Sequence, residues 1–257
     1  MSLAQSARVS GALALRSLRR IRRLPSAFVP SLAMPVFMAV AFTGAFRAIT
    51  EVPGFPTDDA ASWFVPLAAL QGAAFGGIGI GLGALGDIET GFYDRLLLAP
   101  STPAALVAGP LLAGALRALF PVTAALAVGF VTGMEVPGGP AGVVLLVAVG
   151  AAVCLMAAGW ALGLAYRVRT QAAPGLMQAG LLLAFFLSTT QVPLSVMTGW
   201  LHTVARVNPM TNVFRLARQG FLGEITWHDT WPGLLVLSVG IAATTLFAYR
   251  GVARLQR

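Results

Sequence analysis

The chain has 257 residues, of which 57% are hydrophobic and only 10% are charged, and its mean hydropathy is +0.81. A water-soluble domain carries roughly 25% charged residues, so this composition excludes an ordinary soluble domain and indicates a protein of the lipid bilayer. All 17 basic residues are arginine, and the lack of lysine excludes a P-loop ATPase and a lysine Schiff-base enzyme. The net charge of +8 does not indicate a nucleic-acid partner, because the arginines lie at the edges of apolar runs rather than in one patch.

The first segment, residues 8–24, is predicted to be an amphipathic helix in the head-group layer. On a helix that turns about 100° per residue, its large apolar side chains fall on one arc and its arginines fall mostly on the other. Such arginines would face anionic lipid. The alternative is the basic flank of a first membrane span. The side chains concerned are Leu13, Leu15, Leu18, Ile21 and Leu24 on the apolar arc, and Arg16, Arg19, Arg20, Arg22 and Arg23 on the basic arc.

Six apolar runs follow, each near or above the length of about 20 residues that a helix needs to cross a bilayer. With the N-terminus inside, twelve arginines fall in inside segments and four in outside segments, and this bias predicts that both chain ends are cytoplasmic. We therefore expect an all-α membrane protein with a six-transmembrane-helix bundle. The arginine-rich, lysine-free composition of the chain indicates a bacterial cell membrane. The runs cover residues 27–46, 62–85, 104–132, 141–166, 174–193 and 231–250.

Arg117 lies inside the third run, where a charge is costly and should face protein, water or a head group. It either lines a substrate pathway or lies near the inner interface and extends its guanidinium to water. The interfacial position is the simpler interpretation. The run itself is long enough to tilt or to extend beyond the bilayer.

The connection after the second run, Asp87 to Pro103, is predicted to lie inside and to contain a short exposed helix. Charged side chains alternate there with large apolar ones, and two prolines end the segment. A plain polar loop does not need those apolar residues, whereas a helix that inserts into a groove on a partner protein does. The residues concerned are Asp87, Glu89, Gly91, Phe92, Asp94, Arg95 and Leu96.

The outside connection between the fifth and sixth runs is too apolar for a solvated loop. Residues 193–207 and 210–222 are predicted to form two short helices around Asn208-Pro209, which enter the outer leaflet or cap the bundle. Just before them, Ser188, Thr189 and Gln191 either hydrogen-bond across helices or line a pathway. The sequence leaves these two interpretations open.

Other motifs are attributed to packing rather than to chemistry. Residues 81–86 match G-x-G-x-x-G, but they end an apolar run instead of joining a strand to a helix, so close helix packing is the better interpretation. His202 and His228 are too few and too distant for a closed zinc site. No Ser-His-Asp or H-E-x-x-H pattern is present. We therefore expect no catalytic residues, no metal and no bound cofactor on this chain.

Three passages resemble permeases of ATP-binding-cassette exporters of the type 2 class, closest to the daunorubicin-resistance type. The segment from Asp87 to Pro100 is similar to the family's acidic, glycine-containing segment after the second span. Residues 187–201 are similar to its stretch after the fifth span, with Thr198 standing where a proline is expected. Residues 208–211, followed by Arg218, Gly220 and Gly223, are similar to its Asn-Pro-x-Thr motif.

The resemblance implies the fold and the partners. Residues 8–24 would be the elbow helix, 87–100 the coupling helix that docks on the ATPase, and 193–223 the re-entrant helices between spans 5 and 6. The working exporter would contain two ATP-binding subunits and a second permease copy or paralogue, in contact with membrane lipids. ATP and magnesium would bind the partner chain, and the cargo would be hydrophobic or amphipathic. Candidate pathway or gate residues are Arg117, Ser188, Thr189, Gln191, Asn208 and Pro209.

Two alternatives to an ATP-driven exporter remain at this point. An ion-coupled secondary exporter would need a buried acidic residue to bind the ion, yet all nine acidic residues lie outside the apolar runs or at their edges. A non-transporting membrane scaffold is compatible with the sequence.

Overall fold

The computed structural model describes residues 8–16, 25–98, 102–170 and 172–255. Every regular element in these ranges is a helix, and residues 8–16 are helical as well. The named elements are α2 (Pro25–Ala45), η1 (Arg47–Glu51), α3 (Ala60–Glu89), α4 (Phe92–Leu98), α5 (Pro103–Arg117), α6 (Leu119–Val131), α7 (Gly139–Val168), α8 (Ala173–Phe186), α9 (Gly199–Val207), α10 (Pro209–Leu222) and α11 (Trp227–Leu255).

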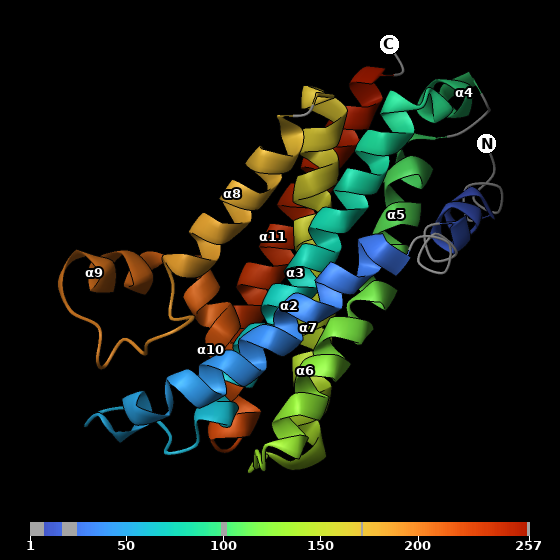
Figure 1. Cartoon of the computed structure of the whole chain (residues 1–257). Coiled ribbons are helices and arrows are strands. Elements are labelled where there is room, and N and C mark those ends of the chain that lie inside the picture. Colours follow the sequence, from blue (N-terminus) through green and yellow to red (C-terminus); the bar gives the residue numbers. More distant parts are fainter. Residues whose placement is uncertain (1–7, 17–24, 99–101, 171, 256–257) are drawn as a thin grey trace.

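The helices form a bundle around a central pair, α3 and α7, which make the most extensive contact in the structure. α2 and α6 pack on α3, whereas α11, α5 and α10 pack on α7 (Figure 1). α4, residues 8–16 and the end of α11 lie toward one end of the bundle, which we call the α4 end. η1, α9 and α10 lie toward the opposite end, which we call the α10 end (Figure 1).

Four helical segments of the described chain are long and apolar enough to cross a membrane: α3, α5 with α6, α7 and α11. These correspond to the second, third, fourth and sixth predicted spans. α8 has 14 residues, fewer than a span needs, and the described apolar part of α2 covers Leu32–Ala45. The structure therefore supports a membrane helix bundle, and the six-span count stays a prediction.

The third run is one helical stretch with a single interruption at Ala118, which keeps right-handed helical dihedral angles. α5 ends at Arg117 and α6 begins at Leu119. Pro121 has no amide hydrogen to donate to the Arg117 carbonyl, and its ring crowds that carbonyl, which accounts for a break at this point. The two parts together form a 29-residue segment long enough to cross a membrane, and whether it tilts or extends beyond the bilayer stays a prediction.

Glycines set the distance between the two central helices. A Cβ at Gly77 would lie 2.5 Å from the Cys154 carbonyl oxygen, and one at Gly81 would lie 2.4 Å from the Ala161 Cβ. The G-x-G-x-x-G run therefore belongs to a helix interface, as the sequence indicated. The buried Cys154 thiol lies at the same level and donates to the Gly114 carbonyl of α5 at 3.1 Å.

Adjacent glycines on α3 offer a direct test of this packing. We expect Gly77→Ala to lower the free energy of unfolding by about 1–3 kcal/mol, because its methyl group has no room against α7. Gly76→Ala is the matched control: its Cβ would meet only the Cys154 sulfur, at 3.8 Å, and it brings the same gain in helix propensity. Denaturant unfolding in detergent micelles measures both variants. Equal stability of the two would contradict the close approach.

Candidate functional site

A sharp corner joins α3 to α4 at the α4 end. α3 ends at Glu89, Gly91 takes a φ of +68°, and α4 starts at Phe92. A positive φ after a helix end favours glycine, which has no Cβ to clash. The single helix predicted over residues 87–100 is therefore wrong: Asp87 and Glu89 belong to the last turn of α3, and only Phe92–Leu98 forms a separate helix. Residues 99–100 lie outside the described ranges.

Asp87 is held by the N-terminal helix. Arg16 Nη1 donates to Asp87 Oδ2 at 2.6 Å, and Nη2 donates to Oδ1 at 2.9 Å. The same guanidinium lies over the Phe92 ring, 3.9 Å from its centroid. The hydrogen bonds to Asp87 raise the pKa of Arg16, against an opposing effect of burial. Asp87 and Phe92, both predicted to contact a partner, thus contact residues 8–16 of their own chain.

The N-terminal helix also packs on α5 at close range. A Cβ at Gly109 would lie 2.7 Å from the Leu13 Cβ and 2.8 Å from the Ser10 carbonyl oxygen. The described part of the predicted elbow helix is therefore helical and docked on the bundle, and it carries an arginine into the α3–α4 corner. The remainder of that prediction, residues 17–24, lies outside the described ranges.

Tyr93 fastens α4 to α7. Its hydroxyl donates to the hydroxyl of Tyr166 near the end of α7, at an O–O distance of 2.7 Å, and both side chains are buried. Burial, more than any neighbour, raises the pKa of Tyr93, so its hydroxyl stays protonated and able to donate. α4 therefore cannot shift alone without breaking a buried hydrogen bond.

Three of the other predicted partner-contact side chains face outward, whereas Leu96 packs against the hydrophobic core. Glu89, Asp94 and Arg95 are exposed, and Leu96 is half-buried. Asp94 and Arg95 make no ion pair with any residue in the described ranges. The corner thus exposes charged side chains, while its inner side chains hold it to α7 and to the N-terminal helix.

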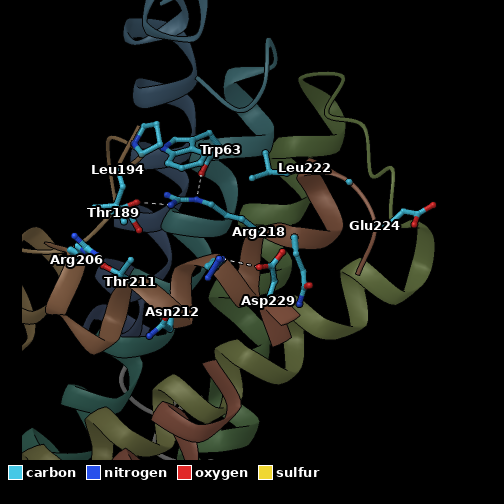
Figure 2. Close-up of a pocket in the computed structure, with 14 residues that line it drawn as sticks. Trp63, Thr189, Leu194, Arg206, Thr211, Asn212, Arg218, Leu222, Glu224 and Asp229 are labelled. Carbon is cyan, nitrogen blue, oxygen red and sulfur yellow. Dashed lines mark hydrogen bonds and ion pairs between the residues drawn. The ribbon is translucent and has the colours of Figure 1, made fainter. Parts of the chain in front are cut away.

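A buried arginine dominates the α10 end. Arg218 of α10 is 2% exposed, and its guanidinium lies over the Trp63 ring, 3.7 Å from the centroid. Its Nε donates to the Trp63 carbonyl at 3.0 Å, and its two terminal nitrogens donate to the carbonyls of Thr189 and Thr190. Figure 2 shows Arg218 reaching toward Trp63 and Thr189. One side chain therefore joins α10, the start of α3 and the segment after α8.

Asn208 joins two of these elements, α10 and the end of α8. Its Nδ2 donates to the carbonyls of Ala184 and Leu187 at 2.9 and 2.8 Å, at the end of α8. Its Oδ1 accepts from the Met210 amide at 2.9 Å and so caps α10, and Pro209 occupies the first turn. The Asn-Pro pair is a helix cap and a cross-link between two segments.

Polar residues after α8 hydrogen-bond within the protein. The Ser188 hydroxyl donates to the Phe185 carbonyl at 2.6 Å, and the Gln191 carbonyl accepts from Trp63 Nε1 at 2.9 Å. The Thr189 carbonyl accepts a hydrogen bond from Arg218. The Ser188 side chain therefore bonds within its own segment, and Thr189 and Gln191 contribute backbone carbonyls, so the two interpretations that the sequence left open both stay predictions.

Arg117 lies far from that cluster. A Cβ at Gly79 would be 3.7 Å from Arg117 Nη2, which places the guanidinium about two-thirds of the way along α3, nearer to the α4 end. Both interpretations of Arg117, an interfacial position and a pathway-lining position, stay predictions. The structure does not bring Arg117 together with Asn208 or with Ser188.

Two important side chains were absent from the predicted site. Arg16 contacts Asp87 across 71 positions, and no local pattern predicts such a pair. Arg218 left a signal: it follows Phe214 by four residues, on the stripe of α10 that carries Met210, Ala217 and Phe221, all of them buried. A charge on an apolar stripe has to be paired with polar groups.

The contacts described at both ends of the bundle connect helices to one another. Within the described ranges, no group of three or more His, Cys, Asp or Glu side chains could hold a metal ion.

Comparison with known proteins agrees with this description. The profile of the ABC-2 type transporter family matches residues 9–222. The chain is also 26% identical over 243 residues to the daunorubicin resistance ABC transporter permease protein DrrB1 of Streptomyces coeruleorubidus, covering 91% of this chain and 81% of that protein.

Replacing Arg218 tests its structural role. We expect Arg218→Met to lower the free energy of unfolding by about 3–5 kcal/mol, because three buried carbonyls lose their donors. Arg215→Met on the same helix is the control: that side chain is 47% exposed and pairs with Asp229 at 2.9 Å, so we expect a loss below about 1 kcal/mol. Denaturant unfolding in micelles, with limited proteolysis of residues 187–198, reports both. Equal losses would contradict the assignment.

Proposed function

The chain belongs to the ABC-2 type transporter family, and from this membership we propose that it is the transmembrane permease subunit of an ABC exporter. ATP hydrolysis takes place on separate ATP-binding subunits, two copies of which assemble with this chain and a second permease, identical or paralogous. ATP and magnesium bind those partners. This chain has no lysine for a Walker A loop, which agrees with a division of labour between chains.

The proposed cargo is a hydrophobic or amphipathic molecule, drug-like or lipid-like, moved out of the cytoplasm or the inner leaflet. The matched relative is named for daunorubicin resistance, which supports an amphipathic drug-like cargo. The bundle lies in the cell membrane with both chain ends in the cytoplasm, as the arginine distribution predicts. The α4 end is then the cytoplasmic end.

The observation that carries the coupling role is the construction of the α3–α4 corner. Glu89, Asp94 and Arg95 are exposed for contact with an ATPase, while Tyr93 and Asp87 connect the same corner to α7 and to residues 8–16. A push on α4 therefore moves two central helices together. Motion of the ATPase pair changes the populations of inward- and outward-open states in this way.

We assign the closed outer gate to the α10 end. Arg218 and Asn208, with Pro209 as the first residue of α10, tie that helix to the start of α3 and to the end of α8. Ser188, Thr189 and Gln191 belong to the same closed arrangement. Arg117, beside Gly79 of α3, is the candidate pathway residue. Opening a path at this end requires these contacts to move as a group or to break.

Association with an ATPase is the first test. We expect the intact chain to co-purify with its cognate ABC ATPase in lipid nanodiscs and to stimulate ATP hydrolysis. The charge exchange Asp94→Arg with Arg95→Asp keeps the net charge and alters only exposed side chains, so it should weaken association about tenfold or more without unfolding the bundle.

Glu135→Arg serves as the control for that exchange, because Glu135 is exposed between α6 and α7, away from the corner. Undiminished binding by the Asp94/Arg95 variant would show that the corner is not the docking surface. An intact chain that recruits no ATPase would favour an ion-coupled exporter or a non-transporting membrane protein.

A charge exchange between Arg16 and Asp87 tests transmission through the corner. Each single change, Arg16→Asp or Asp87→Arg, should lower permease-stimulated ATPase activity, and the double variant should recover part of it because the ion pair is rebuilt with reversed polarity. Stability should change by less than about 1 kcal/mol, since the Arg16 side chain is 43% exposed. Arg8→Asp, on the same helix at an exposed position, controls for charge alone. No recovery in the double variant would rule out a role for this pair.

A further inference from the structure

The α10 end contains a pocket of about 550 Å³ that the gate does not explain. It is bounded by the start of α3, the segment between α8 and α9, the end of α9, one face of α10 and the start of α11 (Figure 2). Apolar Pro193, Leu194 and Leu222 contribute to its wall beside polar residues of α10. The pocket is therefore amphipathic and large enough for a small polar group with an apolar attachment.

Arginine side chains give the α9–α10 side of this pocket a positive charge. Arg206, Arg215 and Arg218 all line it, against Asp229 on that side, while Glu224 lies at the opposite end (Figure 2). Arg218 donates to three carbonyls, and Arg215 pairs with Asp229 through its Nε. The local excess of positive charge favours an anionic ligand.

Arg206 is the side chain most available to such a ligand. It is exposed in the last turn of α9, and it has no hydrogen bond, ion pair or ring contact with any residue of the described ranges. Figure 2 shows it beside Thr211 and Asn212 of α10. The Asn212 amide group also makes no hydrogen bond to the described part of the chain. A guanidinium and an amide at one mouth of a pocket are suitable donors for phosphate oxygens.

Tryptophans indicate the depth at which this pocket lies. Four of the five tryptophans of the chain are at the α10 end: Trp63 in the pocket wall, and Trp200, Trp227 and Trp231, which are 70%, 73% and 46% exposed. Exposed tryptophan collects where head groups meet the hydrocarbon of a bilayer. The pocket therefore opens at the level of lipid phosphates rather than in bulk water.

We propose that this pocket binds the phosphate head group of an anionic phospholipid, with Arg206 and Asn212 as the phosphate donors and with Leu194 and Leu222 against the start of the acyl chains. The site borders the proposed outer gate, because Thr189 and Arg218 also line the pocket, and the inference requires membrane insertion but not ATP coupling. A lipid bound here contacts α9, α10 and the start of α11 at once, so it stabilises the closed cap by linkage.

The test compares lipid dependence of stability in variants of the full chain. Thermal unfolding is followed in nanodiscs of phosphatidylcholine alone and with added phosphatidylglycerol, and binding is counted by native mass spectrometry. We expect phosphatidylglycerol to raise the melting temperature of the intact chain, and Arg206→Gln to weaken its binding about tenfold. Arg206→Lys, which keeps the charge but not the planar fork, should be intermediate.

Arg47→Gln is the matched control, because Arg47 is an exposed arginine of η1 at the same end and outside the pocket. Retained lipid binding in that variant, with loss in Arg206→Gln, supports the site. Equal losses in both would attribute the effect to general surface charge and overturn the proposal, as would equal stability in the two lipid mixtures. Inorganic phosphate or glycerol phosphate that stabilises the chain as well as the lipid does would overturn the lipid assignment and leave a soluble phosphate as the ligand.

Discussion

The Arg218 guanidinium donates hydrogen bonds to backbone carbonyls of the segment between α8 and α9, which leaves helical geometry inside an apolar bundle. α8 ends at Phe186 and α9 begins only at Gly199, so the intervening carbonyls lack helical partners. Unpaired carbonyls are costly where water is scarce. Arg218 supplies donors to two of them and to the Trp63 carbonyl, and Asn208 supplies two more at the end of α8. The irregular segment, and with it the position of α9 and α10, depends on these two side chains.

The two ends of the molecule are connected through α3 and α7. α3, about 45 Å long, carries Trp63 under Arg218 at one end and Asp87 under Arg16 at the other. α7 touches α10 through a backbone contact at Gly142, where a Cβ would lie 2.9 Å from the Gly220 Cα, and holds α4 through Tyr166. Between these points, glycines such as Gly81 leave no gap between the two helices. The pair is therefore closely packed between the two ends of the molecule.

The helices could be predicted from local features of the sequence, whereas the contacts between helices could be seen only in the folded structure. The helical N-terminal segment, the Asn208-Pro209 junction and the exposed corner after α3 follow from periodicity, capping residues and turn chemistry. The division of residues 87–100 depends on the positive φ of Gly91, and a glycine within a helical pattern does not by itself reveal that angle. The Arg16–Asp87 pair and the three acceptors of Arg218 join segments far apart in sequence, so they follow only from tertiary packing. The depth of Arg117 in the bilayer stays a prediction, because neither the sequence nor the packing of the helices fixes the position of the membrane.

The buried position of Cys154 has a practical consequence for spectroscopy. The only thiol of this chain is enclosed between α3, α5 and α7, so thiol-directed spin labels and fluorophores should ignore it in the folded protein. A cysteine introduced at an exposed position such as Glu135 or Asp94 would then be the sole reporter on each copy. Distances between labelled copies, measured in the native sequence background, would follow the arrangement of the permeases through an ATP cycle.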